Sequence, residues 1–153
     1  MKKITLLLVF VVTTSLAQVK GNGDIETKSF PIENIKNIKI NFYANVTIDA
    51  SKKESLIITT DSNMFELIEK KVVDGTLYLD QKEWISPSKT TKIIIGAPNI
   101  NRIEQGTHDI TKIINVDNDE LKVNAPIGNI FIEGKTKTLQ IDSKGSKIDA
   151  KNY

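Results

Sequence analysis

The chain contains a single histidine, and acids beside it could orient the ring for catalysis. His108 stands directly before Asp109 and four positions after Glu104. A hydrolytic triad would also need a serine alongside the imidazole. The repeat described below puts Ser143 at an equivalent turn two coils away, roughly 10 Å distant at the spacing of β-strands. Because that separation is too long for a hydrogen bond, we expect a solvated turn histidine and predict no catalytic residues.

Acidic residues gather in the stretch NVDNDELK, where Asp117, Asp119 and Glu120 could offer oxygen ligands to calcium. The stretch lacks the glycine and the distal glutamate of an EF-hand loop, and it lacks the nonapeptide glycine-aspartate repeat of calcium-binding β-rolls. A solvated loop between coils is therefore expected. The chain has no cysteine and one histidine, which disfavours a zinc site. We predict no metal site and no cofactor.

Aromatic side chains are the remaining candidates for ligand contacts. Trp84, Tyr43 and Phe131, with Tyr78, could form a stacking surface for sugar rings. Tyr43 and Phe131 fall out of phase with the inward residues of their strands, so we expect both to be exposed. Single exposed aromatic residues are common on protein surfaces. A glycan-binding surface would need at least two of these residues on one face. Trp84, Tyr43 and Phe131 are the predicted binding residues.

The N-terminus has the layout of a secretory signal peptide. Lys2 and Lys3 precede an apolar run from Ile4 to Val12, and small residues follow up to Ala17. A membrane anchor is the alternative, but the run is about half of the roughly 20 residues needed to span a bilayer. We predict cleavage after Ala17, a single domain over residues 18–153, and export to the periplasm, the outer-membrane surface or the medium. Without cysteine, disulfides cannot support an exported domain.

The charge balance argues against two classes of partner. The chain has 21 basic and 19 acidic residues, and removing Lys2 and Lys3 with the leader makes the two numbers equal. The remaining basic residues are one arginine, Arg102, and dispersed lysines. Nucleic acids and anionic membrane surfaces select for concentrated positive charge. We expect neither as a partner, and no transmembrane span in the mature chain.

Alternating apolar residues predict strands in the first half of the chain. The stretch from Ile35 to Ser51 has a period of two, and further strands are predicted at residues 54–61, 76–81 and 91–96. The expected inward residues of the first stretch are Ile38, Ile40, Phe42, Ala44, Val46 and Ile48. Between residues 61 and 75 the spacing changes to three or four, with Asp61 or Ser62 as a possible N-cap. We predict one short helix at about residues 62–72, ending near Asp74-Gly75.

A repeat of eighteen residues begins after Pro98. It aligns Ile103, Leu121 and Leu139, then Gln105, Val123 and Ile141, and it pairs Ile130 with Ile148, with glycines at Gly106, Gly128 and Gly145. Such a period indicates stacked units that bury a shared core. Glu104 would then lie beside Lys122, and Glu133 beside Lys151. The pattern predicts an all-β, parallel β-helix-like solenoid. An antiparallel β-sandwich is the alternative, and it is disfavoured because no type I′ hairpin turn such as Asn-Gly links two alternating runs.

Several stretches resemble the head GIN domain of putative autotransporter adhesins. They are the opening GNG, the segment ending in DGTL, PNI after a buried strand, and LQIDSKGSKIDA. The resemblance covers residues 21–153 and implies a right-handed parallel β-helix-like solenoid of an exported bacterial protein. The Ser-Gly-Ser-Gly turns of that family are replaced here by EQGTHD, APIGNI and SKGSKI. The family domain also continues for further coils, so this chain is expected either to be a short member or to have an open last coil that needs a cap or a partner.

We therefore expect an exported, non-enzymatic binding or adhesion module of the bacterial cell envelope, with glycans or envelope proteins as partners. A polysaccharide-active β-helix enzyme is one alternative, and it would need paired carboxylates at a cleft. A structural module that forms homo-oligomers through its open C-terminal coil is another.

Overall fold

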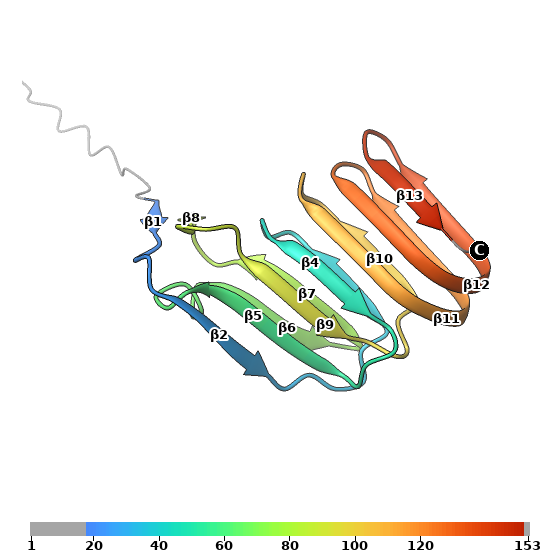
Figure 1. The fold of residues 1–153 in the computed structure, drawn as a ribbon, viewed down its shortest axis with the longest axis horizontal. Helices are drawn as coiled ribbons and strands as arrows, with labels where there is room; N and C mark the ends of the chain where they lie inside the picture. Colours follow the sequence, from blue (N-terminus) through green and yellow to red (C-terminus); the bar gives the residue numbers. More distant parts are fainter. Residues whose placement is uncertain (1–17, 152–153) are drawn as a thin grey trace, which may run out of the picture.

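The computed structural model describes residues 18–151, and this part of the chain consists of β-strands joined by turns (Figure 1). The leader predicted over residues 1–17 lies outside the described residues. Within them, no helix is long and apolar enough to cross a membrane. The strands are β1 (Val19–Lys20), β2 (Ile25–Phe30), β3 (Asn37–Ile40), β4 (Asn45–Asp49), β5 (Ser55–Asp61), β6 (Ile68–Val73), β7 (Thr76–Gln81), β8 (Ile85–Ser86), β9 (Lys92–Gly96), β10 (Arg102–Gln105), β11 (Ile110–Ala125), β12 (Asn129–Ser143) and β13 (Lys147–Lys151).

Eleven strands of the described chain form one mixed sheet. The order is β2-β5-β9-β4-β11-β10-β3-β7-β6, with β12 joined to β11 and β13 joined to β12. Strand β5 pairs antiparallel with β2 and β9, and β6 pairs antiparallel with β7. The other neighbours in this sheet run parallel. Strands β1 and β8 form a separate parallel pair.

The long strand β11 curls this sheet around one core. Its first part places Thr111 opposite Val46 of β4, and its later part places Lys122 opposite Arg102 of β10. Strand β12 accompanies β11 through both parts. The inward side chains of the two parts meet, because one core cluster contains residues from both. The product is a curled, open half-barrel (Figure 1).

The predicted inward residues of the first alternating stretch are confirmed. All six are at most 1% exposed: Ile38, Ile40, Phe42, Ala44, Val46 and Ile48. The alternation continues through the turn between β3 and β4, so one pattern in the sequence corresponds to two strands in different parts of the sheet. Burying a valine, isoleucine or phenylalanine side chain of this set contributes about 1.5–3 kcal/mol of hydrophobic free energy.

The predicted helix at residues 62–72 is wrong. Residues 62–67 form turns, and Ile68–Val73 is strand β6, which pairs with β7 through a hairpin. The hairpin turns at Asp74 and Gly75, which both have positive φ angles, 47° and 73°. Two adjacent residues with positive φ suit the twist of a two-residue hairpin, and Asp-Gly is a preferred sequence for it. The spacing of three to four therefore arose from a turn followed by a strand.

The prediction of a parallel β-helix solenoid is also wrong, because the sheet is mixed. The eighteen-residue repeat starts only after Pro98, and the chain before it uses the β6-β7 hairpin and the antiparallel strand β5. Parallel neighbours outnumber antiparallel ones, so the antiparallel sandwich does not describe the fold either.

The repeat does set the strand register at the C-terminal end. Leu121 lies opposite Leu139, and Ile130 lies opposite Ile148, as the eighteen-residue shift predicts. Between β10 and β11 the shift is twenty residues, because Ile103 lies opposite Val123. The eighteen-residue shift between β12 and β13 places Glu133 opposite Lys151, as expected. Glu104 instead faces Asn124, and Lys122 faces Arg102.

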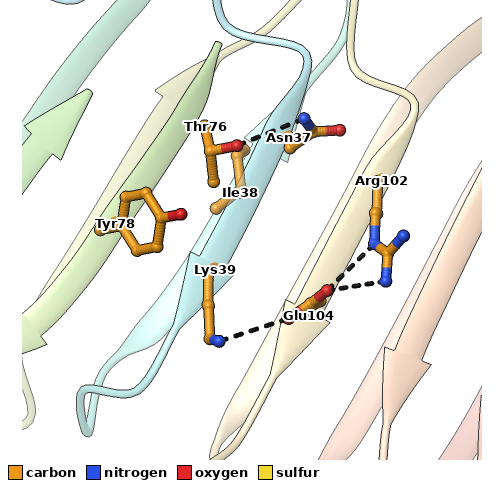
Figure 2. A pocket seen from close by; sticks show the side chains of 7 residues that line it. All are labelled: Asn37, Ile38, Lys39, Thr76, Tyr78, Arg102 and Glu104. Carbon is orange, nitrogen blue, oxygen red and sulfur yellow. Dashed lines mark hydrogen bonds and ion pairs between the residues drawn. The ribbon is translucent and has the colours of Figure 1, made fainter. Parts of the chain in front are cut away.

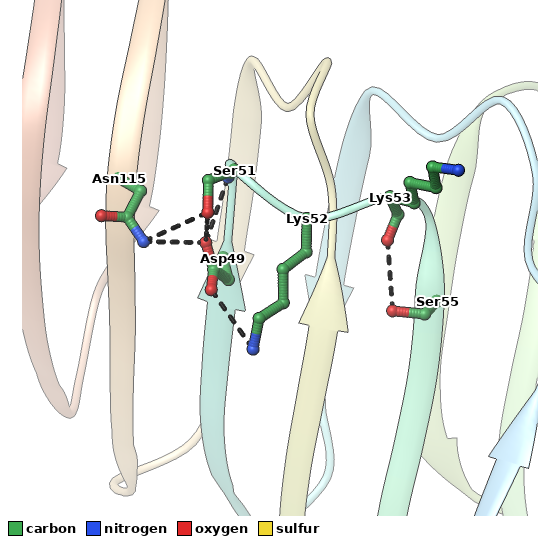
Figure 3. A network of polar contacts seen from close by, with 6 residues as sticks. All are labelled: Asp49, Ser51, Lys52, Lys53, Ser55 and Asn115. Atoms are coloured by element: carbon green, nitrogen blue, oxygen red, sulfur yellow. Dashed lines mark hydrogen bonds and ion pairs between the residues drawn. The ribbon is translucent and has the colours of Figure 1, made fainter.

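Asp49 links the end of β4 to the bend in β11 through side-chain hydrogen bonds (Figure 3). Its Oδ1 accepts hydrogen bonds from the Asn115 side chain at 2.9 Å and from the Ser51 hydroxyl at 2.7 Å. The Lys52 ammonium lies 3.4 Å from Oδ2. Asn115 has a φ of 56°, a left-handed conformation that asparagine tolerates well. The Asn115 hydrogen bond, followed by those of Ser51, lowers the pKa of Asp49 to about 2.

Asp61, considered above as a helix cap, instead connects three segments at the N-terminal end. It is fully buried at the end of β5. Its Oδ1 accepts from the Gly23 amide at 2.7 Å and the Ser88 hydroxyl at 2.6 Å, and its Oδ2 accepts from the Ser88 amide at 2.8 Å. Burial raises the pKa of Asp61, but the hydrogen bonds from Ser88 and Gly23 outweigh it, so the net shift is downward.

Candidate binding face

Two rows of polar side chains cross the outer surface of five neighbouring strands. The inward residues of β7, β3, β10 and β11 include the buried Leu77, Ile38, Ile103 and Val123, so the residues between them point outward. The strand register joins these outward residues into two rows across the sheet. We call the ten residues the cross-strand face: Thr76, Asn37, Arg102, Lys122 and Gln140 in one row, and Tyr78, Lys39, Glu104, Asn124 and Asp142 in the other.

Two shallow depressions lie along this face and share one residue. The first, of about 280 Å³, is drawn in Figure 2 and is lined by Asn37, Ile38, Lys39, Thr76, Tyr78, Arg102 and Glu104. The second, of about 120 Å³, is lined by Arg102, Lys122, Val123, Asn124, Gln140 and Asp142. Arg102 belongs to both. The two depressions therefore form an extended surface that crosses the strands, with no deep cavity.

Ion pairs fix the side chains at the centre of the face. Glu104 Oε1 lies 2.9 Å from Arg102 Nη2, and Arg102 Nε donates to the same oxygen at 3.0 Å. The Lys39 ammonium lies 3.6 Å from Glu104 Oε2. Exposed ion pairs contribute about 0–1 kcal/mol each to stability. Their main effect here is to hold two cations around one acid in a defined arrangement.

An aromatic ring and an amide complete the first depression. Tyr78 is 38% exposed and presents its ring beside Lys39 (Figure 2). Asn37 Nδ2 donates a hydrogen bond to Thr76 Oγ1 at 3.3 Å. Glu104 is the one carboxylate that lines this depression among the described residues. The depression thus offers hydrogen-bond donors and acceptors, a flat ring and paired charges.

The outer surface of the other half of the sheet is more apolar. Its central row places Ile94, Thr47, Lys112, Phe131 and Asp149 opposite one another in turn. Ile94 is 39% exposed and Phe131 is 36% exposed. Depressions of about 250 and 290 Å³ meet at Lys112.

The three predicted binding residues lie on separate elements. Trp84 is 61% exposed and precedes β8, where its carbonyl oxygen accepts a hydrogen bond from the Val19 amide at 2.9 Å. Tyr43 is 58% exposed between β3 and β4, and Phe131 belongs to β12 on the apolar half. Each of the three exposes its ring. Their role in binding stays a prediction, and the depression with an aromatic side chain on the polar half contains Tyr78 instead.

Sequence reasoning missed Arg102, Lys39 and Glu104 as neighbours. Each occupies an outward position in an alternating strand, and this signal was present in the sequence. Which of these positions become adjacent depends on strand order, because β3 lies between β7 and β10. The twenty-residue shift from β10 to β11 then brings Arg102 opposite Lys122.

The histidine and the acidic stretch take part in other contacts. His108 is exposed in the turn after β10, and Ser143 hydrogen-bonds Ser146. Burial raises the pKa of the neighbouring Asp109, against the opposing effects of the Ala44 amide and the Thr107 hydroxyl. The acidic stretch lies within β11 and not in a loop, and Asp119 pairs with Lys137 at 2.6 Å. Across residues 18–151, no three His, Asp or Glu side chains gather as a metal-binding group.

The described residues form an all-β scaffold with an extended, shallow polar face. Residues 34–153 match the family model described as "Putative auto-transporter adhesin, head GIN domain". The chain belongs to this family, as its sequence stretches indicated. No curated protein matches the sequence.

Solved structures share the fold. A putative adhesin from Parabacteroides merdae is 18% identical with a TM-score of 0.76, and the match covers 87% of this chain and 58% of that one. A putative lipid binding protein from Parabacteroides distasonis is 21% identical with a TM-score of 0.72, covering 89% and 63%. A putative adhesin from Bacteroides fragilis is 21% identical with a TM-score of 0.71, covering 88% and 64%. The chain thus spans 58–64% of the length of these three relatives.

Proposed function

We propose that this chain is an exported, non-enzymatic binding or adhesion module of the bacterial cell envelope, and that its cross-strand face binds glycans. One observation carries the proposal. Ten outward side chains form two rows across five neighbouring parallel strands, with amides, hydroxyls, charges and one exposed tyrosine among them. Membership of an adhesin family and the names of two similar structures support a binding role.

The physical form of the face suits an extended ligand. Neighbouring strands repeat at about 4.8 Å, so the rows offer a hydrogen-bonding group at each step. A sugar chain carries hydroxyl groups along its edges and apolar C–H faces on its rings, and a tyrosine ring has a matching flat apolar surface with a polar tip. Shallow contacts of this kind bind weakly one at a time. Adhesion then gains strength from many copies acting together.

The purified chain, tested on a broad glycan panel, is expected to bind a subset of its members. Tyr78→Ala should lower the affinity for that subset about tenfold, because it removes the ring that lines the first depression. Trp84→Ala and Phe131→Ala remove exposed rings outside the cross-strand face, at residues that the sequence predicted for binding. A loss of affinity in either variant as large as that in Tyr78→Ala would assign the binding to those residues instead. A panel without binding would contradict the glycan proposal and leave envelope proteins as partners.

The same preparations test the non-enzymatic part of the proposal. Incubation with envelope polysaccharides should release no reducing or unsaturated sugar ends. Release of such ends by the purified chain, abolished by substitution of a carboxylate such as Glu104→Gln, would instead favour the polysaccharide-active enzyme.

A further inference from the structure

The chain's one arginine occupies the junction of the two depressions on the cross-strand face. Arg102 lines both, and the strand register puts it between Asn37 on β3 and Lys122 on β11. Its side chain is 51% exposed. A ligand that follows the rows across the strands therefore passes over Arg102.

The guanidinium group is held by one edge and open at the other. Nε and Nη2 both point to Glu104 Oε1, at 3.0 and 2.9 Å. Nη1 and the second N–H of Nη2 form the remaining edge, and this edge has no protein partner among residues 18–151. Figure 2 shows the outer nitrogen directed away from Glu104. Two parallel N–H groups on one planar edge match the two oxygens of a carboxylate.

Two like charges lie opposite each other at this point. Arg102 and Lys122 are direct partners on adjacent parallel strands. Like charges in directly opposite positions destabilise a sheet. Lys122 pairs with Glu120 at 3.1 Å, and Glu120 does not line either depression. An anion placed between Arg102 and Lys122 would relieve the repulsion that the sheet register creates.

The cross-strand face carries a net positive charge. Lys39, Arg102 and Lys122 supply three positive charges, against the two negative charges of Glu104 and Asp142. The chain as a whole lacks this bias once the predicted leader is removed. The positive excess is therefore a local property of the surface that the ligand would contact.

We propose that the cross-strand face selects acidic polysaccharides, with a uronate carboxylate of the ligand held by the open edge of Arg102 and by Lys122. The inference rests on the glycan-binding function proposed above and names the chemical class of the ligand. Glu104 is the positioning residue, because it fixes the guanidinium through the opposite edge. Tyr78, two strands away from Arg102, contacts a different sugar unit of the same chain.

The test compares polygalacturonate and polymannuronate with the same polymers after chemical reduction of their carboxyl groups. The purified chain should bind at least one of the polyuronates, and carboxyl reduction should weaken that binding about tenfold. Arg102→Lys keeps the charge but loses the planar fork, so it should also weaken binding to the polyuronate about tenfold. Binding to the reduced polymer should stay unchanged in this variant.

Lys112→Gln is the matched control, because it removes an exposed charge from the centre of the apolar half of the sheet. It should bind both forms of the polymer as the wild-type chain does. Circular dichroism and thermal unfolding establish that each variant is folded. Equal binding of the native and reduced polymers, or an Arg102→Lys variant with unchanged affinity, would overturn the selection for acids while glycan binding stands. No binding of either form would overturn the proposed uronate ligand, whereas glycan binding itself fails only if the broad glycan panel also shows no binding.

Discussion

Asp49 illustrates how one charged residue contributes to the stability of the fold. Its carboxylate is 7% exposed and accepts hydrogen bonds from Asn115 and Ser51, which lower its pKa from 3.8 to about 2. A carboxylate with a lower pKa in the folded state stabilises the protein above its unfolded pKa. That contribution is lost as the pH falls from about 4 towards 2.

Asp49→Asn should therefore lower the free energy of unfolding at pH 7 by about 1–2 kcal/mol. The difference from the wild-type chain should shrink between pH 4 and pH 2, because the wild-type carboxylate becomes protonated there. Urea denaturation at pH 7, 4 and 2.5 measures this. Asp142→Asn removes an exposed carboxylate and should show little change at any of the three values. A difference for Asp49→Asn that stays constant with pH would contradict the role of the charge.

At the scale of the element, the turns of the repeat are less alike than the sequence suggests. Gly128 has a φ of 96°, and a β-carbon there would overlap the backbone carbonyl oxygen of Thr107 and the side-chain nitrogen Nε2 of Gln105. Gly145 lies in the next turn, seventeen residues later, and a β-carbon there would have the Pro126 carbonyl oxygen as its nearest neighbour at 3.5 Å, an ordinary contact. The first turn therefore requires glycine, and the second does not.

Gly128→Ala should destabilise the chain by more than about 1 kcal/mol, because alanine disfavours positive φ and the neighbouring backbone leaves no room. Gly145→Ala should change the free energy of unfolding by less than about 1 kcal/mol. Thermal and urea unfolding of both variants measure the difference. Equal destabilisation by the two substitutions would show that the turns have the same requirement.

Strands were predictable from the sequence where alternation was strong, and register was predictable only where the repeat was regular. The buried residues from Ile38 to Ile48 and the pairing of Leu121 with Leu139 follow directly from the pattern. The spacing of three to four before Asp74-Gly75 predicts the end of a helix there, although Asp-Gly is itself a hairpin signal and the structure has a hairpin at this point. The cross-strand face was not predicted, because its members are joined by strand order and by the irregular shift between β10 and β11.

At the scale of the whole molecule, the outer edge of β12 is open in the described part of the chain. Strand β13 covers Asn129 to Glu133 but not the later residues of β12. Leu139 and Ile141 lie opposite the buried Leu121 and Val123, yet Ile141 is 40% exposed. An edge with unpaired backbone and apolar side chains is a template for another strand.

If a second copy of the chain covers this edge, the mass in solution should rise with concentration. Ile141→Lys should reduce this association, since it puts a charge into the contact. Ile94→Lys alters an isoleucine of similar exposure, 39%, on the apolar half of the sheet and should leave the mass unchanged. Analytical ultracentrifugation over a dilution series provides the measurement. A monomer at every concentration would exclude association through this edge.

We expect ligands to bind across β7, β3, β10, β11 and β12, on the outward polar side. Amide chemical-shift mapping by NMR, during titration with a bound glycan, tests it most directly. The largest shifts should fall on Tyr78, Lys39, Arg102 and Lys122, and the amides of Ile94, Lys112 and Phe131 should be unaffected. Shifts concentrated on the apolar half of the sheet, or on Trp84 and Tyr43, would contradict it.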